Sequence, residues 1–212
     1  MKNKTLIFDL GGVLLDIFIE RSFGALMALG MDAAILSEKR CLMDDMIQRY
    51  DRGDVSTTEF YSYIAQNLPQ SVQALPQEEL LERIHDIWNM MLGSFSREKI
   101  EYIRTLRERG HRVVMLSNTN EGHWETIERI FRYTVGVPLS EFFDELYLSF
   151  RMNLRKPEPE IFEALLRSEG VEAADCIFFD DSQENCDAAL ALGIEAVVMQ
   201  RNEAWNTISI LE

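Results

Sequence analysis

Three aspartates stand directly behind two apolar runs of this sequence. Asp9 follows residues 5–8, and Asp180-Asp181 follow residues 177–179. Such runs are typical of buried strands, and the carboxyl ends of parallel strands meet at one edge of a sheet. Converging carboxylates repel one another, which implies either a bound cation or strongly raised pKa values, and all-oxygen ligation favours Mg²⁺. We therefore expect these carboxylates to form a magnesium site.

Another apolar run and a lysine supply groups that suit a phosphate. Ser117 and Asn118 end the run and can donate hydrogen bonds to phosphoryl oxygens, while Lys156 precedes a helix and adds a fixed positive charge. An aspartate beside a metal can attack phosphorus and form an aspartyl-phosphate, which makes Asp9 the expected nucleophile. Mg²⁺ would offset the repulsion between that carboxylate and the phosphate.

Alternating strands and helices must position these side chains. The apolar runs predict five strands, over residues 5–8, 112–117, 143–149, 175–179 and 195–199. Amphipathic helices are expected between them, over residues 96–109, 121–132, 158–168 and 182–192. This alternation implies right-handed crossovers and a parallel sheet covered on both faces. The expected fold class is therefore α/β, with a doubly wound, Rossmann-like core.

A stretch with only helical patterns separates the first strand from the others. Its apolar residues recur at helical spacing, which predicts four helices, over residues 21–29, 33–48, 57–67 and 77–92. Ser56 and Glu59 have the spacing of a capping box before one of these helices. The sequence thus predicts a core formed by residues 1–16 and 93–212, and an inserted helical bundle formed by residues 17–92.

The composition limits the classes of function. The chain of 212 residues suffices for one core with a small insertion, and its net charge of -15 argues against nucleic acid or an anionic membrane as a partner. Cys41, Cys176 and Cys186 lack metal-type spacing and indicate a reducing compartment, and no signal peptide or membrane-spanning run is recognisable. We expect a cytoplasmic monomer or homodimer that binds small phosphorylated molecules.

Four motifs, in this order, resemble those of the haloacid dehalogenase superfamily of hydrolases. The stretch 9–16, Asp-Leu-Gly-Gly-Val-Leu-Leu-Asp, is similar to the family's first motif, Asp-x-Asp-Gly-Thr/Val-Leu-x-Asp. Ser117 at a strand end resembles the second motif, Lys156-Pro157 the third, and Asp180-Asp181 with Asn185 the fourth. One such motif alone is weak evidence, but four in order across the core are specific.

The resemblance implies an activity and a division of roles. Asp9 would be the nucleophile, and Mg²⁺ would be held by Asp9, the backbone carbonyl of Gly11 and Asp181, with Asp180 as an outer or second ligand. Residues 17–92 resemble the family's mobile helical C1 cap, which closes over the site and shapes the substrate pocket. The implied activity is Mg²⁺-dependent hydrolysis of phosphomonoesters of small metabolites, sugar phosphates among them.

The first motif departs from the family at Gly11. Gly11 and Gly12 let the backbone approach a phosphate, and amides there can bind an anion, but most phosphatases of the family carry an Asp in place of Gly11 as general acid and base. Loss of such a group typically costs about 10²- to 10⁴-fold in rate. The motif resembles that of bacterial sugar phosphatases similar to the α-glucose-1-phosphate phosphatases, which also reads Phe-Asp-Leu-Gly. Asp16, Glu20 and His123 are candidate replacements for the missing acid.

Two other functions remain open. A metal-free 2-haloacid dehalogenase also accepts a residue other than Asp at position 11, but Asp180-Asp181 without a metal would repel an ionised nucleophile. A phosphate-binding or scaffold protein that has lost catalysis would explain Gly11. The retention of Asp9, Lys156 and Asp181 argues against that function, because binding alone has less need of a nucleophile.

Overall fold

A five-stranded parallel sheet forms the centre of the larger lobe. The computed structural model describes residues 4–36 and 44–202, and its sheet has the strand order β5-β4-β1-β6-β7. The strands are β1 (Thr5–Phe8), β4 (Arg112–Ser117), β5 (Glu145–Leu148), β6 (Cys176–Asp180) and β7 (Glu195–Val198). Every neighbouring pair in this sheet is parallel, which confirms the predicted fold class.

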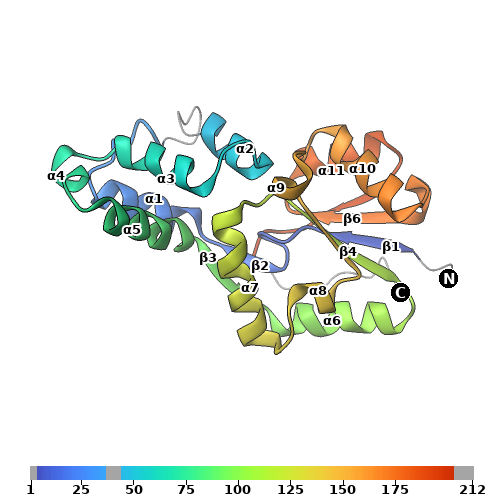
Figure 1. Ribbon diagram of the computed structural model, residues 1–212. Helices are drawn as coiled ribbons and strands as arrows, with labels where there is room; N and C mark the ends of the chain where they lie inside the picture. Colours follow the sequence, from blue (N-terminus) through green and yellow to red (C-terminus); the bar gives the residue numbers. More distant parts are fainter. Residues whose placement is uncertain (1–3, 37–43, 203–212) are drawn as a thin grey trace.

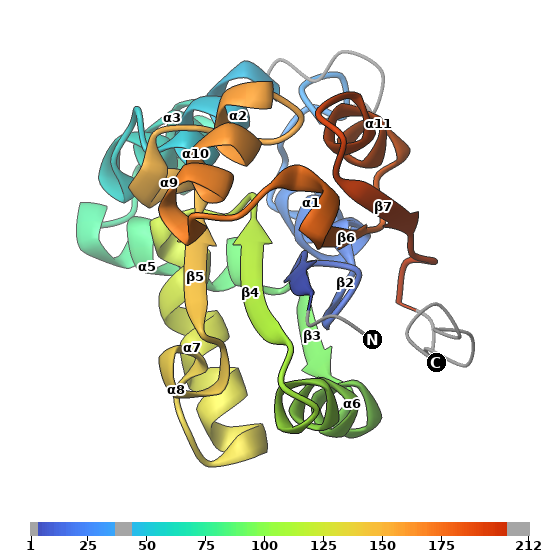
Figure 2. The same cartoon turned by 90° about the vertical axis from the view of Figure 1, so that its right-hand side faces the viewer.

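Helices cover both faces of this sheet (Figures 1 and 2). One face carries α6 (Arg97–Glu108), α7 (Glu121–Val135) and α8 (Leu139–Phe142). The other face carries α10 (Pro159–Glu169) and α11 (Gln183–Ala191). The short helix α9 (Ser149–Met152) follows β5, and a 3₁₀ turn (Ala173–Asp175) precedes β6. The sheet is therefore the middle of three layers.

The central strands are apolar on both faces because each face has its own helical cover. Leu6 and Phe8 pack in the cluster that includes α6 and α7, whereas Ile7 lies between them and packs in the cluster with α10 and α11. All three side chains are 0% exposed, and burial of each such side chain contributes about 1.5–3 kcal/mol. The burial of β1 on both sides fixes its register, and with it the position of the residue that follows.

The smaller lobe is helical, as predicted for the stretch after the first strand. It contains α1 (Ile19–Ala28), α2 (Asp44–Arg52), α3 (Thr57–Gln66), α4 (Gln70–Gln73) and α5 (Gln77–Asn89). Its core holds stacked aromatic rings, with Tyr50 and Phe60 centroids 4.3 Å apart and Trp88 against Phe60 at 4.8 Å. The capping box before α3 is present. We call this lobe the cap; the exact limits proposed for it, residues 17–92, stay a prediction.

Two of the predicted cap helices are wrong in their limits. Residues 33–36 form turns and the helix begins at Asp44, while residues 37–43 lie outside the described part. Oδ1 of Asp32 accepts a hydrogen bond from the N–H of Ala34, and such a local bond competes with helix formation. The helix predicted to reach Leu92 ends at Asn89, since Leu92 begins a strand.

That strand belongs to a two-stranded ribbon that joins the lobes. β2 (Leu15–Ile17) pairs antiparallel with β3 (Leu92–Phe95), and the sequence patterns predicted neither strand. Figure 1 shows this ribbon between the cap and the sheet. The chain therefore enters and leaves the cap through adjacent strands.

The cap also docks on the core far from this ribbon. The end of α2 packs on α9, where the carbonyl of Asp51 accepts from the hydroxyl of Ser149 and Arg52 pairs with Glu158. Gly53 has φ +80°, and a Cβ there would lie 2.3 Å from the carbonyl oxygen of Phe150. Only a glycine permits this close approach.

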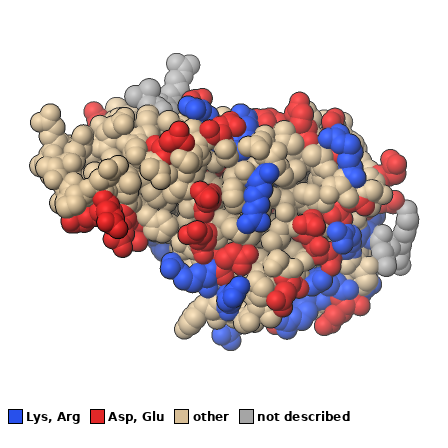
Figure 3. Space-filling model, viewed as in Figure 1, with Lys and Arg blue, Asp and Glu red and all other residues tan. Residues whose placement is uncertain are grey.

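Charged side chains of both signs cover the face of the molecule that is viewed in Figure 3. Figure 3 shows acidic side chains on both lobes and a mixture of both charges over the core on the face viewed. None of the described helices is long and apolar enough to cross a membrane.

We expect Gly53→Ala to destabilise the protein more than Gly170→Ala does. Both glycines have positive φ, so both variants bear the left-handed penalty of about 1–2 kcal/mol. Nothing lies within 4 Å of a Cβ at Gly170, whereas overlap at Gly53 should cost a further ~1–3 kcal/mol. Denaturant unfolding measures both free energies. Equal losses would contradict the tight docking of α2.

Candidate active site

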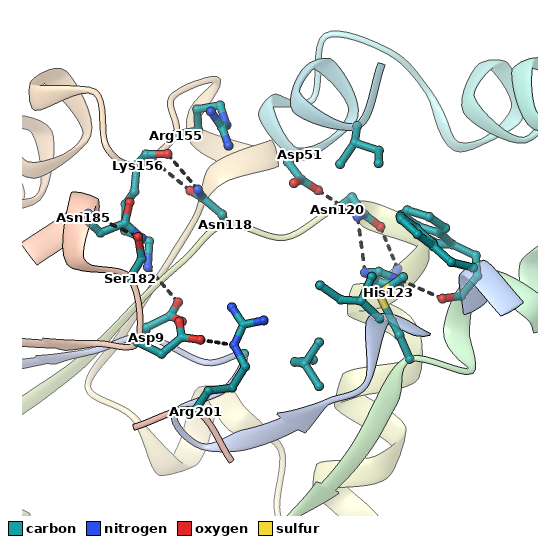
Figure 4. Close-up of a pocket in the computed structure, with 18 residues that line it drawn as sticks. Asp9, Asp51, Asn118, Asn120, His123, Arg155, Lys156, Ser182, Asn185 and Arg201 are labelled. Carbon is teal, nitrogen blue, oxygen red and sulfur yellow. Dashed lines mark hydrogen bonds and ion pairs between the residues drawn. The ribbon is translucent and has the colours of Figure 1, made fainter. Parts of the chain in front are cut away.

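A buried lysine lies between two of the predicted carboxylates. Figure 4 shows this residue, Lys156, beside one of them, Asp9. The ammonium of Lys156 donates to Oδ1 of Asp9 (2.7 Å), to Oδ2 of Asp180 (2.6 Å) and to the carbonyl of Leu116 (2.8 Å). The side chain of Lys156 is 1% exposed. An ammonium has three donors, and all three are used here. Lys156 therefore ties the carboxyl ends of β1, β4 and β6 together.

Asn118 holds the backbone of this lysine in place. Its Oδ1 accepts from the N–H of Lys156 (2.9 Å), and its Nδ2 donates to the carbonyl of Lys156 (2.8 Å). The reciprocal pair links the end of β4 to the loop before α10. The amide of Asn118 is thus engaged in positioning Lys156, and its expected contact with phosphate stays a prediction.

Negative charge exceeds positive charge around Asp9. Burial raises the pKa of Asp9 to about 7; Lys156 opposes this rise, while the charges of Asp180 and Asp181 add to it. Burial works against the charge of Lys156, but its carboxylate partners raise the pKa of Lys156 above the ordinary value. Lys156 and Arg201 pair with these three acids, and a divalent cation would compensate the negative charge that remains.

The donor set also suits such a cation. Carboxylate oxygens of Asp9, Asp180 and Asp181 lie within 4.8 Å of one another. Both oxygens of Asp180 already accept hydrogen bonds, from the N–H of Ser182 (2.8 Å) and from Asn185 (3.0 and 3.1 Å). Oδ2 of Asp9, by contrast, accepts no hydrogen bond from the described residues. An all-oxygen set with open positions at Asp9 fits Mg²⁺.

Gly12 allows Asp181 to approach the first loop. Gly12 has φ +80°, and a Cβ there would lie 2.5 Å from Oδ2 of Asp181. The N–H of Gly12 donates to the carbonyl of Leu15 (2.7 Å), so this amide closes the turn. Asp181 also pairs with the guanidinium of Arg201, which no sequence pattern had singled out.

The predicted residues gather around one cavity. Five of them line a cavity of about 430 Å³: Asp9, Gly11, Asn118, Lys156 and Asp181. Three others are buried beside them: Gly12, Ser117 and Asp180. The opposite wall is apolar and comes from the ribbon, α1, α2, α5 and the residue before β3: Ile17, Ile19, Phe23, Ile47, Trp88 and Met91. The cavity thus lies between the carboxyl ends of the strands and the cap.

A second cluster of polar side chains faces the same cavity, and of its members the sequence analysis named only His123. Nδ2 of Asn120 donates to Oδ1 of Asp51 (2.9 Å), which joins α7 to the cap helix α2. Burial raises the pKa of Asp51 to about 6, against the opposing effects of Asn120 and Arg155. Nε of Arg155 is buried and has no hydrogen-bond partner among the residues that the structure describes. The sequence could have indicated Asn120, because it is the N-cap residue of α7, and Arg155, because it precedes Lys156. Nothing in the sequence distinguishes Asp51 from the other acidic residues.

His123 belongs to this group and is held at both ring nitrogens. Nε2 lies 3.2 Å from the carbonyl of Trp88 and Nδ1 lies 3.3 Å from Nδ2 of Asn120, so Nε2 carries the proton. The imidazole stacks on Trp88 with centroids 5.1 Å apart. Burial lowers the pKa of His123 to about 4. Of the candidates for the missing acid, Asp16 and Glu20 are not among the residues that line the cavity.

Comparison with known proteins places the chain among hydrolases. A model of the haloacid dehalogenase-like hydrolases matches residues 3–193. The D-ribitol-5-phosphate phosphatase of Bacteroides thetaiotaomicron is 28% identical over 204 residues, which cover 95% of this chain and 94% of that protein. The phosphorylated carbohydrates phosphatase of Thermotoga maritima is 25% identical over 142 residues, which cover 62% of each chain.

Solved structures agree with these matches. The crystal structure of a HAD family enzyme from Bacteroides thetaiotaomicron, in complex with magnesium and inorganic phosphate, is similar with a TM-score of 0.83 and 30% identity. The similarity covers 96% of this chain and 98% of that chain. An L-2-haloacid dehalogenase has a TM-score of 0.60 at 18% identity, which indicates a common fold.

We expect Lys156→Met to destabilise the metal-free protein by about 3–5 kcal/mol, because two buried carboxylates lose their cation. The loss should be smaller at pH 5 than at pH 8, because protonation removes the uncompensated charges at low pH. Denaturant unfolding in EDTA at both pH values measures it. Arg104→Met, which removes an exposed pair with Glu101, is the control and should cost under ~1 kcal/mol. A similarly small loss for Lys156→Met at pH 8 would refute this account.

The buried His123 should make the protein less stable in acid. The unfolded imidazole takes up a proton near pH 6.5, whereas the folded one does so only near pH 4. Stability is therefore lost as the pH falls from about 6.5 to about 4, by up to ~3 kcal/mol for this group. Urea unfolding of wild type and His123→Gln across this range isolates the effect. His111→Gln, at the other end of β4, should follow the wild-type curve.

Proposed function

Because this chain belongs to the haloacid dehalogenase-like hydrolase family, we propose that it is a Mg²⁺-dependent phosphatase of small phosphorylated metabolites, with carbohydrate and polyol phosphates as its substrate class. One observation carries the proposal: Lys156 holds Asp9 between Asp180 and Asp181 at the wall of a cavity. A binding protein has less need of a nucleophilic carboxylate held in this way. The fold, the relatives and the acidic cluster all support the same chemistry.

Asp9 is the nucleophile in this proposal. Lys156 donates to Oδ1, whose second lone pair remains for the metal, and Oδ2 attacks phosphorus. The new bond joins Oδ2 to phosphorus, the bond from phosphorus to the ester oxygen breaks, and that oxygen leaves with the electron pair. Water then attacks the aspartyl-phosphate, which releases inorganic phosphate and restores Asp9. The raised pKa of Asp9 means that the carboxylate needs positive charge nearby to stay ionised.

Asp9, the carbonyl of Gly11 and Asp181 would hold Mg²⁺, which supplies positive charge for the carboxylate and the phosphoryl oxygens when bound. Asp180 stands behind them and orients Lys156, since its own oxygens already accept hydrogen bonds. Asp181 would have to share its carboxylate between the metal and Arg201. Bound Mg²⁺ would thus add to the fixed charges of Lys156 and Arg201.

The cavity can also bind the phosphoryl group and a small organic part of the substrate. The three donors of Lys156 are all used within the protein, so its charge acts on the phosphoryl group without a direct bond. Arg155 lines the cavity, and its Nε has no hydrogen-bond partner among the described residues, so it joins Gly12, Ser117 and Asn118, which the sequence predicts, as a candidate for a contact with the phosphate. A volume of about 430 Å³ suits a small metabolite.

A reducing, cytoplasmic setting fits the cysteines. Cys176 and Cys186 are buried and unpaired in the structure. Disulfides are rare in that compartment, and buried thiols behave there as small apolar side chains. Cys41 lies outside the described residues, so the proposal rests on the other two.

A phosphate-release screen of sugar and polyol phosphates tests the proposed function. We expect turnover with Mg²⁺, a loss of most activity in EDTA, and no turnover above background by Asp9→Asn. Asp187→Asn on the exposed face of α11, whose partner is Gln183, is the matched control and should match wild type. Full activity of Asp9→Asn would overturn the proposal. Halide release from 2-haloacids in EDTA, without any phosphate release, would indicate a dehalogenase.

A further inference from the structure

The proposed phosphatase reaction needs a proton donor that position 11 does not supply. An alkoxide is a poor leaving group, so the ester oxygen of a sugar or polyol phosphate must gain a proton as its bond to phosphorus breaks. Gly11 has no titratable group. A Cβ at Gly11 would lie 3.2 Å from Cγ1 of Ile17, so an apolar side chain occupies the space beside it. The proton must come from another wall of the cavity.

Three carboxyl groups line the cavity in the part of the chain that the structure describes: Asp9, Asp51 and Asp181. Asp9 is the proposed nucleophile and Asp181 a proposed metal ligand. Asp51 alone has no role in the proposed reaction. It comes from the cap helix α2, on the side opposite the strand ends.

We propose that Asp51 is the general acid of this enzyme, donating a proton to the leaving oxygen and then accepting one from the attacking water. The inference rests on the proposed function. In the first step the proton moves from Asp51 to the ester oxygen, and the alcohol leaves neutral. In the second step water attacks the aspartyl-phosphate at phosphorus while its proton moves to Asp51. Asp51 ends protonated, as it began, and one water is consumed.

Hydrogen bonds determine which oxygen of Asp51 acts. Oδ1 accepts from Nδ2 of Asn120 at 2.9 Å, so Oδ2 is the oxygen that can carry the proton. No hydrogen bond from any described residue reaches Oδ2. Asn120 cannot turn freely, because its own Oδ1 accepts from the N–H of His123 (3.0 Å). His123 is held in turn by the carbonyl of Trp88.

The docking of the cap holds Asp51 in the cavity. The carbonyl of Asp51 accepts from Ser149 on the core, and the next residue, Arg52, pairs with Glu158. The close approach at Gly53 completes this contact. If the cap turned away on its ribbon, Asp51 would leave the site with it. The acid is therefore in place only when the cap is docked.

The surrounding charges suit a carboxyl group that exchanges protons near neutrality. Arg155 is the cation facing Asp51 from the loop before α10, and His123 faces it from α7 as a neutral ring. Arg52 and Glu158 lie beside it as a pair. Burial outweighs the effect of Arg155 and raises the pKa of Asp51 to about 6. A phosphate bound to Arg155 would reduce that opposing effect further.

Two esters with different leaving groups test the inference. The probes are p-nitrophenyl phosphate, whose leaving group needs little protonation, and D-ribitol 5-phosphate, or the sugar phosphate of highest turnover in the screen. We expect Asp51→Asn to lower kcat for the alkyl ester about 10²- to 10⁴-fold and to change p-nitrophenyl phosphate turnover less than about threefold. Retained p-nitrophenyl phosphate turnover also shows that the variant is folded. Asp45→Asn, an exposed carboxyl on the same helix, is the control and should match wild type.

The pH profile gives a second readout. Wild-type kcat for the alkyl ester should fall as the pH rises through the pKa of Asp51 in the complex, because the acid form is lost, and Asp51→Asn should lack this limb. Equal losses for both esters would assign Asp51 to cap docking alone and overturn the inference, as would unchanged turnover of both. If wild type hydrolyses neither ester with Mg²⁺, the proposed function itself fails.

Discussion

The ion pairs of Lys156 are the interaction on which the site depends. A buried ammonium costs several kcal/mol unless its charge and all its donors find partners, and here it meets two carboxylates and a carbonyl. These partners come from three different strands, so one side chain holds the edge of the sheet in a single arrangement. The site stays short of positive charge, because Asp9, Asp180 and Asp181 outnumber their two ion-pair partners, Lys156 and Arg201. Structural stability and affinity for a divalent cation therefore have a common origin.

The sequence could predict the part of the site at the strand ends because position in a parallel sheet follows from local patterns. Asp9 and Asp181 stand directly behind apolar runs, and a strand buried on both faces admits only apolar residues. The order of the motifs then brought Lys156 to the same edge. The structure adds what no pattern carries: Asn118 is bound to the backbone of Lys156, and Asp180 is saturated by hydrogen bonds.

The part of the site that the cap contributes depends on contacts between segments that are distant in the sequence. Asp51 meets Asn120 only because the cap docks on the core, and along its own helix Asp51 has no feature that separates it from exposed acids. The ribbon was missed for a similar reason, since strands of three and four residues with little burial show no periodicity. The turns at 33–36 depend on one side-chain hydrogen bond of Asp32, which competes with an otherwise helical pattern.

With glycine at position 11 and the proposed acid, Asp51, on the cap, proton transfer depends on the position of the cap. An acid on the sheet, beside the nucleophile, is present whether the site is open or closed. An acid on α2 reaches the cavity only when Gly53 and Arg52 are seated on the core, which is also when the apolar wall of the cap excludes water. Esters with poor leaving groups are then hydrolysed only by the docked enzyme, and a molecule too large to lie beneath the cap keeps the acid away. The contact between α2 and the core thus determines both the size of substrate that is accepted and the transfer of the proton from Asp51.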